Sequence, residues 1–128
     1  MNLLRGADGR RLCRVPAEDY EALMRSIQLL RESLSAAQRQ QYDRFGFFDV
    51  CGGETGRRYR IRKGLQVNIQ QLNGKGRPVC ELCFVPGGSL VAGDVMLAQK
   101  LALELFERDA LNVANKFPPT SPINGFLP

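Results

Sequence analysis

The residues best suited to chemistry in this 128-residue chain are arginines that alternate along one predicted strand. Residues 57–63 read RRYRIRK, so Tyr59 and Ile61 fall on one face of an extended segment and alternate arginines on the other. Neighbouring arginines on that face lie about 6.5–7 Å apart, twice the rise per residue. This spacing suits an extended polyanion such as single-stranded nucleic acid. The row consists of Arg58, Arg60 and Arg62.

Polar side chains of the next segment are expected beside this row. Gln66, Asn68 and Gln70 alternate with apolar residues and would supply donors and acceptors on the same face. Tyr59 points to the other face, so we predict no aromatic platform for stacked bases. The row therefore predicts a binding site for an acidic macromolecule, either nucleic acid or protein. The alternative is a solvated face that only keeps the sheet soluble.

The distribution of charge supports a basic central region. Residues 51–90 hold seven basic and two acidic side chains. Their difference equals the whole net charge of the chain, +5. Residues 1–50 hold eight basic and seven acidic side chains, and residues 91–128 hold three and four. The excess of cations thus belongs to the predicted sheet and not to either end of the chain.

Four cysteines raise the alternative of a zinc-stabilised domain. Cys80 and Cys83 form a CxxC pair, and Cys51 precedes them in the predicted sheet. Structural zinc usually has four thiolate or imidazole ligands, so Cys13 would complete the set. Against this, residues three apart in a regular strand point to opposite faces unless a bulge separates them. Buried free cysteines and a redox pair are the other two interpretations.

Catalytic motifs are not recognisable in the sequence. The chain has no histidine, which removes the commonest general base and metal ligand. Its GGETG segment lacks the GxxxxGK[ST] pattern of a phosphate-binding loop. We therefore predict a protein without enzymatic activity or cofactor, with zinc as the one alternative. The N-terminus does not read as a secretory leader, and no apolar run reaches the ~20 residues of a membrane span, so we expect a cytoplasmic protein.

Two helices are predicted to flank the strands. The first begins at Pro16, with apolar residues every three or four positions, and ends before Gly46. The second begins at Asp94, a suitable N-cap, and runs to about residue 115. Its apolar face is marked by Leu97, Leu101 and Leu105.

The strands predict the fold class. Alternation and turn residues place them at 47–51, 57–63, 66–70 and 79–85. Asn73-Gly74 predicts a hairpin turn before the last of them. We expect an α+β fold with a long N-terminal helix, an antiparallel meander of three to four strands, and a C-terminal helix packed on one face of the sheet. The domains are an irregular N-terminal segment (1–15), a single α+β domain (16–115) and a Pro-rich tail (116–128).

The first helix offers a second function. Its apolar stripe has the spacing of a short dimer seam, so a homo-oligomeric structural protein, such as a homodimer, is an alternative to packing on the sheet. The stripe consists of Tyr20, Leu23, Ile27, Leu30 and Leu34. We favour the non-enzymatic binding module, with the homo-oligomer and the zinc-stabilised domain as alternatives.

One stretch resembles a known family. The segments YRIRKGLQVNIQQL, CELCFVPGGSLVAGDVMLAQKLALELFE and LNVAN, between Tyr59 and Asn115, are similar to an uncharacterised family of small bacterial and phage-associated proteins. The resemblance implies that the sheet and the second helix form one unit. It implies no activity.

Overall fold

The computed structural model describes residues 17–64, 67–84 and 91–119. Predictions about Cys13, Gln66, the N-terminal segment and most of the tail lie outside these residues. The elements in chain order are α1 (Ala17–Ser33), α2 (Ala36–Phe45), β1 (Phe47–Cys51), β2 (Arg58–Arg62), β3 (Ile69–Leu72), β4 (Pro78–Cys83), α3 (Ala92–Leu105), α4 (Glu107–Val113) and β5 (Asn115–Phe117). The strands form one antiparallel sheet in the order β1-β2-β3-β4-β5, which confirms the α+β class.

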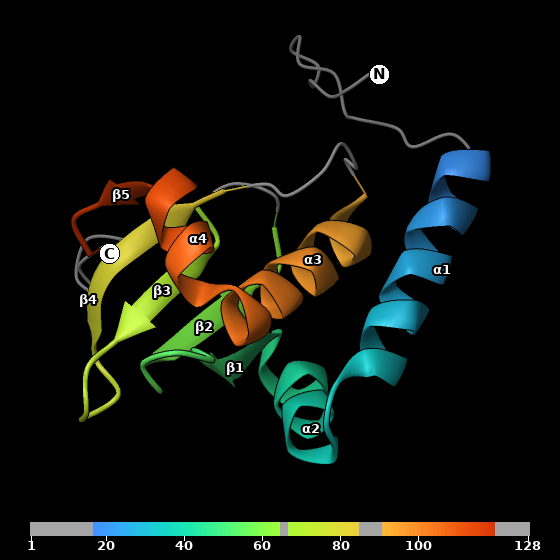
Figure 1. The fold of residues 1–128 in the computed structure, drawn as a ribbon. Helices are drawn as coiled ribbons and strands as arrows, with labels where there is room; N and C mark the ends of the chain where they lie inside the picture. Colours follow the sequence, from blue (N-terminus) through green and yellow to red (C-terminus); the bar gives the residue numbers. More distant parts are fainter. Residues whose placement is uncertain (1–16, 65–66, 85–90, 120–128) are drawn as a thin grey trace, which may run out of the picture.

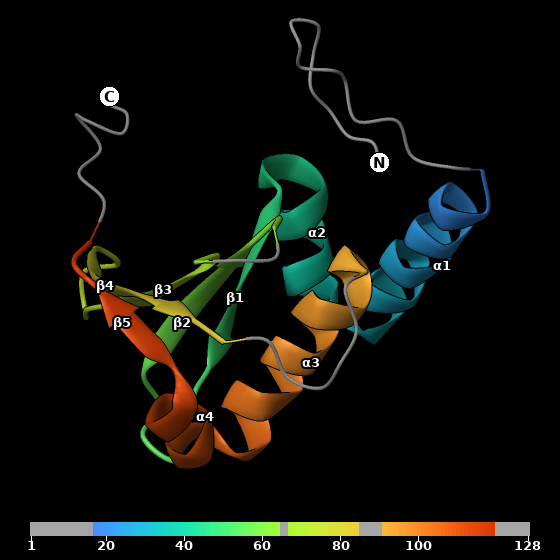
Figure 2. The same cartoon turned by 90° about the horizontal axis from the view of Figure 1, so that it is seen from above.

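The helices and the sheet form layers around one core. The helix α3 lies over one face of the sheet, and α1 lies on the far side of α3 (Figures 1 and 2). The sheet contributes Phe48, Tyr59, Ile61, Ile69 and Leu82 to the core, each fully buried. The opposite sheet face, which we call the outer face, carries the arginine row of β2.

The predicted long helix is in fact two helices separated at Ser35. The Ser35 hydroxyl accepts a hydrogen bond from the backbone N–H of Gln38 (3.1 Å), and the backbone N–H of Ser35 donates to Gln38 Oε1 (3.0 Å). This capping box satisfies donors at the start of α2 and lets the chain change direction. The predicted end before Gly46 is confirmed, because Gly46 takes a left-handed conformation (φ 81°) after Phe45.

Removing this cap is expected to weaken the fold measurably. We expect Ser35→Ala to lower the free energy of unfolding by about 1 kcal/mol, because the first N–H groups of α2 lose their acceptor. Urea denaturation followed by circular dichroism would measure this. Ser33→Ala is the control, since Ser33 only bonds the carbonyl of Leu29 within α1 and is expected to be near neutral. Equal losses in the two variants would contradict a capping role.

The apolar stripe of α1 is largely internal. Leu30 and Leu34 are buried in the core, and Ile27 packs against it. Tyr20, by contrast, is 54% exposed. The core packing of these leucines explains the stripe without a partner helix.

The second predicted helix also divides. It begins at Ala92, so Asp94 lies inside its first turn, and it breaks at Phe106 before α4. The predicted apolar face is only partly internal, because Leu97 packs against the core whereas Leu101 and Leu105 are 43% and 62% exposed. The helix is apolar around most of its circumference, so leucine spacing alone did not select the buried face. The buried positions are Gly93, Val95, Met96, Gln99, Lys100 and Leu103.

Both edges of the sheet have features that limit pairing with a further strand. At the β1 edge, the backbone N–H of Asp49 donates to Gln41 Oε1 (2.9 Å), and Gln38 Nε2 donates to the Asp49 carbonyl (2.9 Å). At the other edge, β5 pairs with β4 and is only three residues long. The prolines that follow predict an irregular tail from Lys116 onward, but the ladder to β4 orders Lys116 and Phe117 as strand residues.

Candidate functional site

The predicted arginine row lies on the outer face, but two of its members are already paired. Arg60 binds Asp49 through two hydrogen bonds, Nε to Oδ1 (2.8 Å) and Nη2 to Oδ2 (3.1 Å). Arg62 Nη2 lies 2.8 Å from Oε1 of Glu81, which is buried. Arg58 is less tightly held, with its Nε 3.8 Å from Asp49 Oδ2. The sheet therefore neutralises much of the row from neighbouring strands.

The three predicted polar partners separate in space. Asn68 is 3% exposed and exchanges two hydrogen bonds with the Gln99 amide of α3 (2.8 and 3.0 Å). Its predicted place on the basic face is wrong, because Val67 has a positive φ of 48° and regular alternation begins only at β3. Gln70 does lie beside the row, as the register partner of Arg60. Gln66 lies outside the described residues.

Three cations without a carboxylate partner in the described part of the chain lie at one end of the sheet. Within the described ranges, Arg57, Lys75 and Arg77 have no carboxylate oxygen within 4 Å. Arg57 precedes β2, and the other two lie in the turn between β3 and β4. We call these three residues the hairpin cations.

The turn that carries two of the hairpin cations is organised by Asn73. Its Oδ1 accepts hydrogen bonds from the backbone N–H groups of Lys75 (2.8 Å) and Arg77 (3.0 Å). Gly76 takes a left-handed conformation (φ 80°), and a Cβ placed there would lie 2.6 Å from Arg58 Nη2. Glycine therefore allows both the turn and the close approach of the Arg58 guanidinium from β2.

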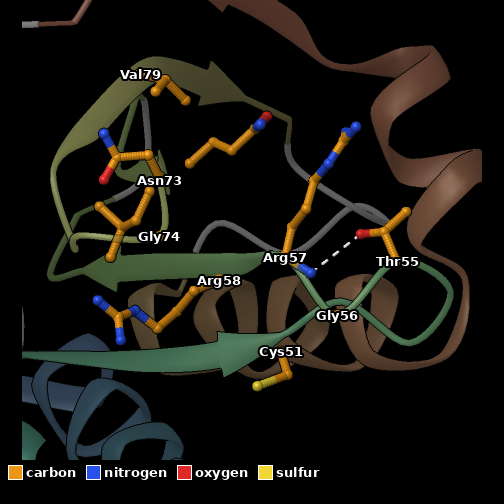
Figure 3. A pocket seen from close by; sticks show the side chains of 10 residues that line it. Cys51, Thr55, Gly56, Arg57, Arg58, Asn73, Gly74 and Val79 are labelled. Atoms are coloured by element: carbon orange, nitrogen blue, oxygen red, sulfur yellow. Dashed lines mark hydrogen bonds between the residues drawn. The ribbon is translucent and has the colours of Figure 1, made fainter.

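A hollow of about 560 Å³ lies between this turn and the β1–β2 loop. Figure 3 shows the side chains around it, with Arg57 and Arg58 from one side and Asn73 and Val79 from the other. The hollow is lined by Cys51, Thr55, Gly56, Arg57, Arg58, Gln71, Leu72, Asn73, Gly74 and Val79. Its charged lining residues are both arginines, so the hollow favours an anionic group.

An aromatic stack, which sequence reasoning missed, lies at the opposite end of β1. The rings of Phe45 and Phe47 are nearly parallel (13°), with centroids 5.4 Å apart. The Arg60 guanidinium lies over Phe47 at 4.1 Å, and that of Arg44 lies 5.3 Å from the Phe45 centroid. Phe45 is 58% exposed. The predicted lack of an aromatic platform on the basic face is therefore wrong.

The cause of the stack is the turn at Gly46. This residue ends α2 and reverses the chain, so the residues on either side of it come face to face. Phe47 pairs in register with Arg62 and thus shares the outer face with the arginine row. The signal in the sequence was the FGF triplet at a predicted helix end.

The cysteines are not brought together. Cys51 is exposed at the rim of the hollow, whereas Cys80 packs against the core, where burial raises the pKa of its thiol. Cys83 lies on the other side of β4 from Cys80, as alternation predicts. Across the part of the chain that the structure describes, no three cysteine, histidine or acidic side chains are placed to hold a metal ion. The predicted set of Cys51, Cys80 and Cys83 is therefore not assembled, and Cys13 lies outside that part.

A buried carboxylate, also missed from the sequence, anchors the loop beside the hollow. Glu107 is fully buried and accepts hydrogen bonds from Tyr59 Oη (2.6 Å), Thr55 Oγ1 (2.6 Å) and the backbone N–H groups of Thr55 (2.8 Å) and Glu54 (3.0 Å). Burial alone raises the pKa of a carboxyl group, but these hydrogen bonds hold the pKa of Glu107 below its ordinary value. Burial, and then the hydrogen bond to Glu107, raises the pKa of Tyr59.

This cluster fixes the loop that follows β1. Gly52 and Gly53 lie so close to Glu107 and to the Glu104 carbonyl that a Cβ at either position would collide with them. The β1–β2 loop, which carries Arg57 and one wall of the hollow, is therefore held rigidly against the start of α4.

Similarity to known proteins does not point to a site in this chain. No family model, curated protein or solved structure matches it. Among the described helices, none combines the length and the apolar character needed to cross a membrane.

Proposed function

We propose that the chain is a non-enzymatic binding module whose outer sheet face receives an acidic macromolecule. The observation that carries the proposal is the division of the cations into two groups. Arg60 and Arg62 are held by Asp49 and Glu81, whereas the hairpin cations have no carboxylate partner in the described ranges. One of them, Arg57, lines the hollow together with Arg58, and the other two lie in the turn beside it. We place the binding site for anionic groups at the end formed by the two hairpins, because the hollow there is lined by Arg57 and Arg58.

The distinction between paired and unpaired cations matters energetically. An unpaired side chain meets a phosphate or carboxylate without first losing another partner, and binding releases the counterions of the polyanion. A guanidinium held by a carboxylate is partly neutralised, because the carboxylate repels an approaching anion and competes with it for the guanidinium. The arginine row would therefore add less affinity than its number of charges predicts.

Replacing the row is also a poor test of binding. Glu81 is 2% exposed, and removal of Arg62 would take away the cation that faces this buried carboxylate. A loss of that kind destabilises the fold itself. The hairpin cations are better targets, because the fold does not use them as ion-pair partners within the described residues.

We expect the triple change Arg57→Gln, Lys75→Gln and Arg77→Gln to weaken binding at least tenfold. The probes are a fluorescein-labelled single-stranded oligonucleotide and a labelled polyglutamate, followed by fluorescence anisotropy at low salt. Because three side chains no longer neutralise a phosphate, the slope of log affinity against log salt should become shallower by about 2, at ~0.7 per phosphate. Thermal stability should change little, because exposed charges contribute weakly to folding.

A charge-matched control distinguishes binding at the hairpin cations from attraction due only to the net charge of the protein. Changing Arg25, Arg31 and Arg108 to glutamine removes the same charge from the helices. Arg25 and Arg108 are exposed, and Arg31 is half-buried in an ion pair with Asp43. This control should keep most of the affinity. If it loses as much as the hairpin triple, only net charge matters and the assignment of the site is wrong. If the unchanged protein binds neither probe at low salt, the proposed function fails.

A further inference from the structure

We infer that the acidic partner is single-stranded nucleic acid, and that an unpaired base stacks on Phe45. The inference rests on the proposed function and identifies its partner. Charge alone does not distinguish nucleic acid from an acidic protein. The aromatic stack does, because a flat exposed ring next to cations is the surface on which bases stack.

The stack is built in advance of any ligand. The Phe47 ring stacks with the Phe45 ring, and the Arg60 guanidinium lies over Phe47. The guanidinium is in turn fixed in its plane by two hydrogen bonds to Asp49. The last ring, Phe45, is 58% exposed, and the Arg44 guanidinium lies over it at 5.3 Å from its centroid. A base that stacks on Phe45 would take the place of this side chain, which could then pair with the adjoining phosphate. A base that continues the stack on Phe45 would meet side chains that already hold the stacked arrangement, so little ordering is needed on binding.

The ion pair with Asp49 makes Arg60 a weaker phosphate ligand, but it also orients the Arg60 guanidinium against the Phe47 ring. Because Asp49 holds it, the planar guanidinium stacks on the Phe47 ring and is not free to follow a phosphate. Core packing does not account for Phe45, which remains more than half exposed after folding. The arrangement is explained by recognition of a planar ligand.

The distance between the stack and the hollow suits a short stretch of one strand. Phe47 and Cys51 stand at the two ends of β1, about 13 Å apart at the usual rise per residue. Arg60, which pairs in register with Asp49, lies between them, and Arg58 pairs with Cys51 at the end next to the hollow. An extended single strand repeats about every 6–7 Å, roughly twice the spacing along one strand of a duplex. A base on Phe45 would therefore place a phosphate about two nucleotides away at the hollow.

Other acidic partners lack either a regular series of negative charges with flat rings or a free base face. An acidic peptide carries carboxylates but no regular series of flat rings, so Phe45 would add little to its binding. In a duplex the bases are already stacked and paired, so the ring would find no free base face. Stacking on one phenylalanine reads no base edge, and we expect tolerance of sequence.

The experiment compares four labelled probes of equal length by fluorescence anisotropy. They are oligothymidylate, the same deoxyribose-phosphate chain without bases, a duplex and polyglutamate. We expect oligothymidylate to bind at least fivefold more tightly than the abasic chain, which corresponds to ~1 kcal/mol for one stacked base. Phe45→Ala should lose this advantage and leave affinity for the abasic chain and polyglutamate unchanged. Phe45→Trp should keep it, because the indole also stacks.

Phe106→Ala is the matched control. Phe106 is 60% exposed and lies between α3 and α4, so its loss removes a similar apolar surface without touching the stack. Thermal melts would verify that each variant is folded. If Phe45→Ala binds oligothymidylate as tightly as the unchanged protein, the base-stacking inference is overturned.

The same probes separate this inference from the proposed function. Equal affinity for polyglutamate, the abasic chain and oligothymidylate would overturn nucleic-acid recognition but keep a general acidic partner, provided the hairpin triple still weakens binding. Failure to bind every probe at low salt would instead overturn the proposed function.

Discussion

Changing Glu107 to alanine is expected to lower the free energy of unfolding by at least about 3 kcal/mol, because several buried donors lose their acceptor. The Glu107 carboxylate accepts from the hydroxyls of Tyr59 and Thr55 and from two backbone N–H groups of the β1–β2 loop. Tyr59 is fully buried, so water cannot replace the lost acceptor without opening the core. Urea denaturation followed by circular dichroism would measure the loss.

The pH dependence gives this prediction a second readout. Because the folded pKa of Glu107 lies below its ordinary value, its charged form stabilises the fold at neutral pH. That contribution is complete above the unfolded pKa of ~4.3 and is lost as pH falls through the folded pKa. Glu107→Gln, which does not titrate, should therefore lose less stability on acidification than the unchanged protein. Parallel stability curves against pH would contradict this assignment of charge.

Gly93→Ala is expected to cost about 3 kcal/mol, because a methyl group has no room at the contact between α1 and α3. A Cβ on Gly93 would lie 2.4 Å from the backbone carbonyl of Ser26, and the backbone N–H of Gly93 donates to Ser26 Oγ (3.2 Å). The two helices must move apart to accept it. Thermal melts would measure the loss, and limited proteolysis would test whether α1 is displaced.

Gly74→Ala is the control for Gly93. Gly74 lies in the hairpin turn, and a Cβ there would meet no atom within 4 Å. Both changes add one methyl group at a glycine, so they differ chiefly in the space available. If the two variants are equally stable, α1 and α3 do not pack in close contact at Gly93.

The strand β2 was predictable because alternation is a local property. In RYRIR the buried and exposed residues follow one another directly, and β2 shows the expected pattern. The turn at Asn73 was readable for the same reason. Breaks in helices are harder to predict, because an apolar stripe continues through them. The break before α2 nevertheless had a signal, since Ser35 and Gln38 form the S-x-x-Q pattern of a capping box.

The candidate site was less predictable because it depends on strand register. Whether Arg60 is free or paired depends on Asp49, eleven residues earlier, lying directly opposite it in β1. No local pattern contains that information. The role of Glu107 was not predicted for the same reason, because its hydrogen bond with Tyr59 joins residues 48 positions apart in the sequence. The charged row could be read from the sequence, but its neutralisation could not.

The protection of the two sheet edges has a consequence for association between native molecules. A strand from a second molecule can extend a sheet only where backbone N–H and C=O groups are free. At β1 the side chains of Gln38 and Gln41 occupy those groups of Asp49. β5 offers three residues, followed by Pro118 and Pro119, which have no N–H to donate. The folded sheet is therefore a poor template for cross-β fibrils, and amyloid growth would have to start from unfolded chains.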